Sequence, residues 1–218
     1  MKKNNKTKET TWKWLSRKLG IEFEEVFILF ALLLLIAFFG ITTDNFFSTA
    51  TITAIVTQLP PLTVVTIGMT LVLISGGIDL SVGSVVAVSG AIVGITFSLF
   101  DFPLLVAAGF AILAGGCAGL INGVLGSYFR LPIFIVTLGM LEAGRGMTYM
   151  LTNSQTVYIG PDIQMFSFPI SAVGVSPAFI VAFGLVITAH LILTRTVYGR
   201  YIVAIGTNEQ AAKISGIR

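Results

Sequence analysis

Long apolar runs, separated only by short polar or glycine- and proline-containing stretches, dominate this 218-residue chain. A helix needs roughly 20 apolar residues to cross the hydrocarbon core of a bilayer. Six segments reach about that length: 23–41, 52–75, 80–100, 103–125, 131–151 and 177–194. The runs are continuous rather than alternating, and open strand edges cannot be satisfied in lipid. The sequence therefore predicts an all-α fold, a polytopic bundle of six transmembrane helices.

The composition excludes a water-soluble globule. Hydrophobic residues make up 55% of the chain and charged residues only 11%, whereas a soluble domain carries roughly a quarter charged residues. Lipid is therefore the solvent for most of this chain. The single cysteine, Cys117, lies inside an apolar run, so we expect neither an intrachain disulfide nor a metal site.

The basic residues predict the orientation of the helices. Seven of the thirteen lie in the first eighteen positions, before an apolar run that we interpret as a retained span rather than a cleaved signal peptide. Such a cationic flank typically fixes membrane orientation and does not indicate nucleic-acid binding. With a cytoplasmic N-terminus, twelve of the thirteen Lys and Arg fall on the cytoplasmic side, and only Arg145 lies within a span. Both termini are therefore expected in the cytoplasm.

This orientation divides the chain into three regions. Residues 1–22 form a basic cytoplasmic N-terminal segment, and residues 23–194 form the transmembrane bundle. Within that bundle, the segment 152–176 lies outside and could form a small extracytoplasmic cap. Residues 195–218 form a second cytoplasmic segment.

Several polar or glycine residues lie at or near membrane depth and are candidates for the pathway of a solute. They are Gly76, Gly77, Asp79, Ser81, Asn122, Glu142 and Arg145. Charges in a span are costly unless they are paired, so they are functional candidates by default. The adjacent prolines Pro60 and Pro61 should kink or break the second span, either as a packing bend or as part of a pathway lining.

Each polar candidate also has a purely structural interpretation. Asp79 can cap the helix that follows it, or it can position a gate or a polar ligand together with Ser81. Glu142 and Arg145 are three residues apart on one helical face and can form a salt bridge or a charge relay. For Asn122 the expected role is an interhelical hydrogen bond.

The motifs of enzymes and nucleotide hydrolases are absent. The sequence contains no phosphate-binding loop, and no H-E-x-x-H, G-x-S-x-G or C-x-x-C. We therefore expect no catalytic residue, no cofactor and no enzymatic activity on this chain. An ATPase partner or an ion gradient must supply the energy for any transport. No stretch of the sequence gathers aromatic and carboxylate residues in the manner of a tight sugar site.

The final cytoplasmic stretch predicts a short helix. Thr207 and Gln210 have the spacing of a capping box, Ala211 and Ala212 favour helix, and Gly216 is a typical terminator. A helix of about two turns is marginal in water. We therefore expect it to be ordered by docking to a partner.

Two motifs resemble those of a known family. The run G-G-I-D-L-S-V-G at 76–83 and the run G-x-N-x-x-A-A-x-x-S-G-I at 206–217 are similar to the permease subunits of monosaccharide ATP-binding-cassette importers. This is the ribose, xylose and galactose branch of those bacterial importers. The stretch L-I-N-G at 120–123 agrees with it.

The resemblance implies a multi-pass protein of the bacterial inner membrane with several partners. These are a second permease copy, an ATPase subunit that uses ATP, an extracytoplasmic sugar-binding protein and a monosaccharide. It also implies a coupling helix that fits a groove on the ATPase. The residues assigned to that coupling element are Gly206, Asn208, Glu209, Ala211, Ala212, Ser215, Gly216 and Ile217.

Family members continue with further spans beyond this helix, so we expect a C-terminally truncated permease. The alternatives are a gradient-driven secondary transporter or channel, and an inactive permease fragment.

Overall fold

The computed structural model describes residues 23–168 and 175–217, and every regular element in those ranges is a helix. The basic segment 1–22, part of the predicted outer segment 152–176, and Arg218 lie outside the described residues. The chain divides into two compact units, and the boundary in the sequence falls between Ile55 and Val56.

The first unit contains α2 (Phe23–Thr42) and the start of α3 (Thr49–Ile74). The turn between them places Asn45 at a φ of 63°, and the rings of Phe39 and Phe46 stack with centroids 6.1 Å apart. The Ser48 hydroxyl accepts a hydrogen bond from the amide of Thr51 at 3.2 Å, which satisfies one of the free amides at the start of α3.

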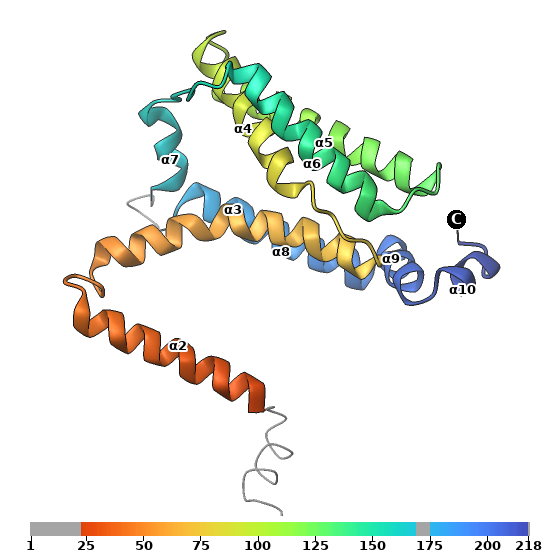
Figure 1. The fold of residues 1–218 in the computed structure, drawn as a ribbon, viewed down its shortest axis with the longest axis horizontal. Coiled ribbons are helices and arrows are strands. Elements are labelled where there is room, and N and C mark those ends of the chain that lie inside the picture. Colours follow the sequence, from red (N-terminus) through yellow and green to blue (C-terminus); the bar gives the residue numbers. More distant parts are fainter. Residues whose placement is uncertain (1–22, 169–174, 218) are drawn as a thin grey trace, which may run out of the picture. The chain divides into compact units, whose positions relative to one another are not determined.

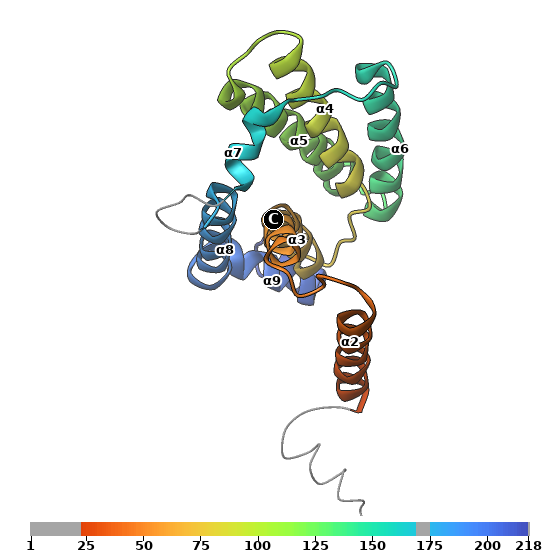
Figure 2. The same ribbon diagram turned by 90° about the vertical axis from the view of Figure 1, so that its left-hand side faces the viewer.

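Three helices of the second unit pack together: α4 (Val82–Ser98), α5 (Leu104–Ser127) and α6 (Ile133–Thr152). They run side by side in both views, with α4 in contact with each of the others (Figures 1 and 2). Their contact surfaces consist mainly of small side chains. The buried positions are Ser84, Val88, Ala91, Gly94, Ala107, Ala111, Asn122, Val136, Thr137 and Gly144. Small residues permit the close backbone approach on which helix association in lipid depends.

The chain after α6 forms short elements and then a long helix. A 3₁₀ turn (Pro161–Ile163) and α7 (Gln164–Ser167) precede α8 (Pro177–Arg195). The Ser176 hydroxyl caps α8 by accepting from the Phe179 amide at 3.2 Å. Then α9 (Val197–Thr207) and α10 (Glu209–Ile214) complete the described chain.

Helices occupy all six segments in which the sequence predicts spans, with ends that differ by a few residues. Three of them, α3, α5 and α8, are long and apolar enough to cross a membrane. Shorter apolar helices cover 27–42 and 82–98. Within the three clear spans only 6%, 11% and 6% of the most apolar window is buried inside the chain. Their side chains are therefore available to lipid or to other subunits.

The second span is not broken at its two prolines, so of the two predicted outcomes, a kink or a break, the break is excluded. Helix α3 runs without interruption through Pro60 and Pro61. Each proline removes one backbone donor, but the helix is long enough on both sides for the remaining hydrogen bonds to hold it together. Pro60 is the buried residue of this helix.

Candidate functional site

The segment between α3 and α4 is held by a compact turn around Asp79. One oxygen of its carboxylate, Oδ1, accepts from the Ser81 amide at 2.8 Å and from the Ser81 hydroxyl at 2.6 Å. Asp79 therefore binds the residue that precedes α4 rather than the first amides inside the helix. The expected cap on the first amides of α4 is therefore not formed, although the carboxylate lies close to the positive end of the α4 dipole.

Asn122 of α5 extends this turn across the helix interface. Its side-chain amide donates to the Ser81 hydroxyl at 3.0 Å, so the predicted interhelical hydrogen bond is confirmed. Ser81 in turn donates to Asp79, which gives a directed chain from Asn122 through Ser81 to Asp79. The Asn122 side chain is 5% exposed, and its carbonyl oxygen is buried without a partner in the described part of the chain. Such an orphaned acceptor costs about 1–3 kcal/mol.

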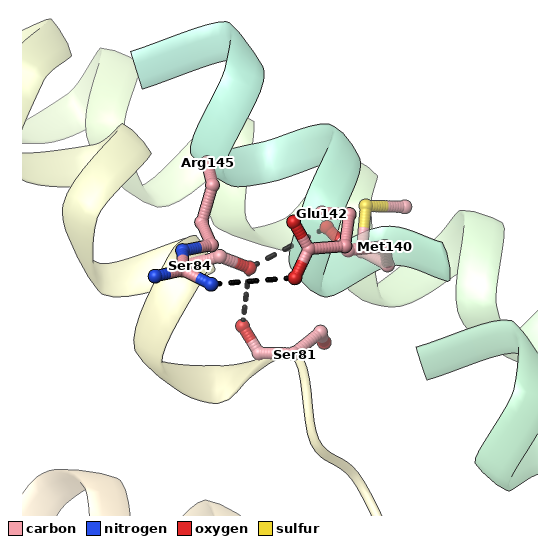
Figure 3. Close-up of polar contacts among 5 residues, drawn as sticks. All are labelled: Ser81, Ser84, Met140, Glu142 and Arg145. Atoms are coloured by element: carbon pink, nitrogen blue, oxygen red, sulfur yellow. Dashed lines mark hydrogen bonds and ion pairs between the residues drawn. The ribbon is translucent and has the colours of Figure 1, made fainter. Parts of the chain in front are cut away.

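Two hydroxyls connect the same region to α6. Ser84 donates to the Ser81 carbonyl at 2.8 Å and makes a longer contact of 3.4 Å to the Met140 carbonyl (Figure 3). Thr137 lies within 3.3 Å of the carbonyl oxygen of Ile78 and is 1% exposed. The segment 78–84 is thus bonded to both α5 and α6.

Glu142 and Arg145 form the predicted ion pair on α6. The Arg145 Nη1 lies 3.3 Å from the Glu142 Oε1 (Figure 3). Both side chains stay largely uncovered, with 60% of Arg145 and 65% of Glu142 exposed. The pair is therefore not part of the α4–α5–α6 interior, and the chain itself leaves it open to another environment.

The two glycines of the first motif differ in role. Gly76 has a φ of +86°, a conformation that glycine adopts without strain, and it ends α3. Its neighbour is Gly206, in α9, whose backbone approaches the end of α3 so closely that a Cβ there would overlap the Ile74 carbonyl oxygen. A Cβ on Gly77 would lie 3.1 Å from the Val72 side chain.

The sequence therefore misses the reason for Gly206. The resemblance assigns Gly206 to the entry of the coupling helix; in the structure it lies near the end of α9, two residues before the cap of α10, and it also allows α9 to contact α3. The two motifs, 76–83 and 206–217, meet at this glycine contact.

Helix α10 is capped by Asn208, not by Thr207. The Asn208 Oδ1 accepts from the Ala211 amide at 3.0 Å, whereas the Thr207 hydroxyl donates back to the Val203 carbonyl at 2.8 Å. The predicted capping box is wrong because α9 continues through Thr207 and so engages its hydroxyl. Asn is as good an N-cap as Ser or Asp.

The C-terminal end of α10 follows the sequence prediction. Gly216 has a φ of +83° and its amide donates to the Lys213 carbonyl at 3.1 Å. The Ile217 amide donates to the Ala212 carbonyl at 3.0 Å, which completes a Schellman motif after Ser215. This six-residue helix is thus defined at both ends by its own sequence.

One side of α10 is covered and the other is open. Ala212 is buried and Ala211 is exposed, while Glu209 and Lys213 form an exposed ion pair. The hydrogen bond and positive charge of Lys213 lower the pKa of Glu209, and Arg130 adds to the lowering. Ile214, which was not among the sequence candidates, is 89% exposed. An isolated apolar residue beside the last turn carries too weak a sequence signal to be singled out.

These residues provide hydrogen bonding and packing rather than bond-making chemistry. In the described ranges no group of three or more His, Cys, Asp or Glu is placed to hold a metal ion. What the arrangement can do is connect the capped helix α10, through α9 and the end of α3, to the Asp79–Ser81–Asn122 chain.

Comparison with known proteins identifies the family. Residues 51–218 match the family of branched-chain amino acid transport system permease components. The chain is 36% identical over 191 residues to the autoinducer 2 import system permease protein LsrC of Yersinia pseudotuberculosis serotype O:1b, and 35% identical to that of Yersinia pestis strain Pestoides F. Each match covers 87% of this chain and 54% of the relative. No solved structure matches the chain.

The chain thus spans about half the length of the curated relatives it matches. The predicted resemblance to permease subunits of ATP-binding-cassette importers and the predicted multi-pass location in the inner membrane are confirmed. The matched region includes every candidate residue described above, from Gly76 to Ile217. The chain belongs to the family of branched-chain amino acid transport system permease components.

Proposed function

We propose that this chain is the translocation subunit of an ATP-driven, binding-protein-dependent importer of a monosaccharide-like solute. Two permease copies enclose the pathway, a separate ATPase binds ATP at the cytoplasmic face, and an extracytoplasmic binding protein delivers the solute. The autoinducer 2 permeases that the chain resembles are parts of import systems. This supports import as the direction of transport.

The observation that carries the proposal is the form of α10. A six-residue helix is too short to be stable alone in water, yet Asn208 caps one end and Gly216 terminates the other. It contacts α9, buries Ala212 and leaves Ile214 exposed. Because both ends of α10 are fixed before it binds, docking requires little further ordering of this helix. An exposed apolar residue on such a helix fits a docking element, and we assign it to the groove of the ATPase.

The proposed topology has six spans and cytoplasmic termini. Helices α2, α3, α4, α5, α6 and α8 are its spans, and α9 and α10 lie on the cytoplasmic side. Arg130 supports this assignment, because its charge reaches Glu209 of α10, and the sequence assigns both residues to the cytoplasm. The N-terminal basic segment belongs to the same side under the positive-inside rule.

The exposed Glu142–Arg145 pair indicates where the pathway or the second permease lies. Charged side chains within a span almost always face a bundle interior, a partner or a water-filled cavity, not lipid. We therefore place the face of α6 that carries this pair toward the second permease copy. The orphaned Asn122 oxygen is suited to accept a hydrogen bond from water or from a solute hydroxyl.

Transport with purified components tests the proposal. The permease is reconstituted in vesicles with the ATPase and the sugar-binding protein of its transport system, and uptake and ATP hydrolysis are measured together. We expect sugar-loaded binding protein to stimulate hydrolysis and uptake in the wild type. Replacing residues 208–215 by a Gly-Ser linker of equal length should abolish both and release the ATPase.

A matched replacement of Thr43–Ser48, in the turn that precedes α3, provides the control for membrane insertion. It should retain the ATPase. Uptake that persists without ATP and collapses with a protonophore would contradict the proposal and support a gradient-driven transporter.

A further inference from the structure

A pocket of about 490 Å³ lies at the end of α4, far along the chain from the coupling element. Its walls come from two segments that are distant in sequence: residues 97–103, from the last turn of α4 to the start of α5, and residues 158–160, after α6. Three aromatic residues, Phe97, Phe102 and Tyr158, line it together with the acidic residue Asp101. The sequence alone does not show that these residues converge.

Several contacts hold the two walls together. The Ser98 hydroxyl donates to the Tyr158 backbone carbonyl at 3.0 Å. Gly94 is buried against the Val157 side chain, and a Cβ there would lie 3.0 Å from Val157 Cγ1. Phe102 stacks on Phe110 of α5 with ring centroids 6.0 Å apart. The pocket is therefore a built feature of the α4–α5–α6 packing.

Asp101 is the acidic residue of the pocket lining. Its carboxylate has no hydrogen bond or ion pair with any residue in the described ranges 23–168 and 175–217. The segments that the sequence assigns to the outside, 42–51, 101–102 and 152–176, contain Asp44, Asp101 and Asp162 and no Lys or Arg. The same side thus offers negative charge without a cation of its own.

We propose that this pocket receives a Lys or Arg side chain of the extracytoplasmic sugar-binding protein when that protein docks. A carboxylate supplies the opposite charge, and aromatic faces attract a cation through their quadrupoles. The proposal rests on the proposed function, because it assigns the pocket to the outer face of an importer.

A cation suits the pocket better than a sugar ring does. A sugar needs several hydrogen-bond donors and acceptors around it, whereas Ser98 already donates to Tyr158. Beyond Asp101, the wall is mostly apolar or aromatic, with Ser98 as its other short polar side chain. A sugar site at this position is therefore the competing outcome that the experiment must separate.

The test uses Asp101→Asn in the complete transporter. Asp101 has a φ of +53°, and Asn tolerates this left-handed backbone as well as Asp does, so the variant removes only the charge. ATP hydrolysis is titrated with sugar-loaded binding protein. We expect the concentration for half-maximal stimulation to rise about three- to thirty-fold, with an unchanged maximum.

A second variant and a control complete the design. Tyr158→Ala should also raise the half-maximal concentration, and it keeps the Ser98 bond, which uses the Tyr158 main chain. Asp44→Asn removes the same charge from another outer segment and should leave the titration close to wild type. Added salt should raise the half-maximal concentration less in Asp101→Asn than in the wild type, because the variant lacks the charge that salt screens.

Two results would overturn the proposal. One is an Asp101→Asn titration curve that coincides with that of Asp44→Asn, which would mean that the pocket charge has no specific role in docking. The other is an unchanged half-maximal concentration with reduced sugar uptake for each ATP hydrolysed, which would assign the pocket to the sugar. A wild-type complex that does not respond to binding protein would instead refute the proposed function itself.

Discussion

Replacing Ile214 by Ala is the perturbation that most directly probes the proposed grip of the ATPase on α10. Ile214 is 89% exposed in the chain by itself, so its removal does not disturb the packing of α10 on α9. Ala is also a better helix former than Ile. Any loss of binding therefore comes from the interface with the partner.

The expected magnitude follows from the area that docking removes from water. Fully burying an exposed Ile side chain is worth about 1.5–3 kcal/mol, and Ala retains roughly a third of that gain. The variant should thus weaken association by about 1–2 kcal/mol. Since about 1.4 kcal/mol corresponds to a tenfold change in Kd, we expect a five- to thirty-fold weaker affinity.

The assay is a titration of the permease in lipid nanodiscs with the purified ATPase, read by a fluorescent label on the ATPase. Leu99→Ala provides a matched control, because Leu99 is also a branched aliphatic residue and is 68% exposed. It is the residue just after α4, at the outer end of the predicted span 80–100 and far from the cytoplasmic side. Equal affinities for wild type and Ile214→Ala, or equal losses in Ile214→Ala and Leu99→Ala, would refute the reasoning.

Three further predictions concern the local structure. Asn208→Ala removes the cap of α10 and should cost about 0.5–2 kcal/mol of helix stability, seen as faster amide exchange across α10, whereas Asn208→Asp should stay near wild type. The pKa of Glu209 is lowered in the folded state, so its stabilisation of α10 is present above the ordinary pKa of 4.5 and is lost as the pH falls through the lowered value; Lys213→Gln should remove this pH dependence of exchange. Gly144→Ala places a Cβ 2.8 Å from the Ser84 hydroxyl, and overpacking of this kind costs about 1–3 kcal/mol, which a lower melting temperature in detergent would report.

Much of the helix layout could be predicted from the sequence, because apolar length alone specifies it. The helices lie where the apolar runs lie, and the Gly216 terminator appears as its residue type predicts. Asn122 forms the interhelical bond expected of a lone polar residue in an apolar helix. These features depend on properties that one residue or one short segment carries by itself.

The features that the sequence could not provide all depend on distant segments coming together. In the sequence Gly206 resembles a helix boundary, and only the structure shows that the Ile74 carbonyl lies against its backbone. Thr207 has the spacing of a capping residue, but α9 extends through it and its hydroxyl donates to the Val203 carbonyl. Local spacing cannot show this. Asp101 and Tyr158 line one pocket only because the end of α4 lies beside the segment that follows α6. Residue patterns carry no direct record of such approaches.

Accessibility of α10 tests the central claim most directly. Cys117, the only cysteine of the sequence, is exposed and is first replaced in Cys117→Ala. Gln210→Cys in that background then places one thiol on the open side of α10. A membrane-impermeant maleimide should label it in inside-out vesicles and not in right-side-out vesicles, and bound ATPase should block the labelling. Labelling from the outer side, or labelling that bound ATPase leaves unchanged, would contradict the account.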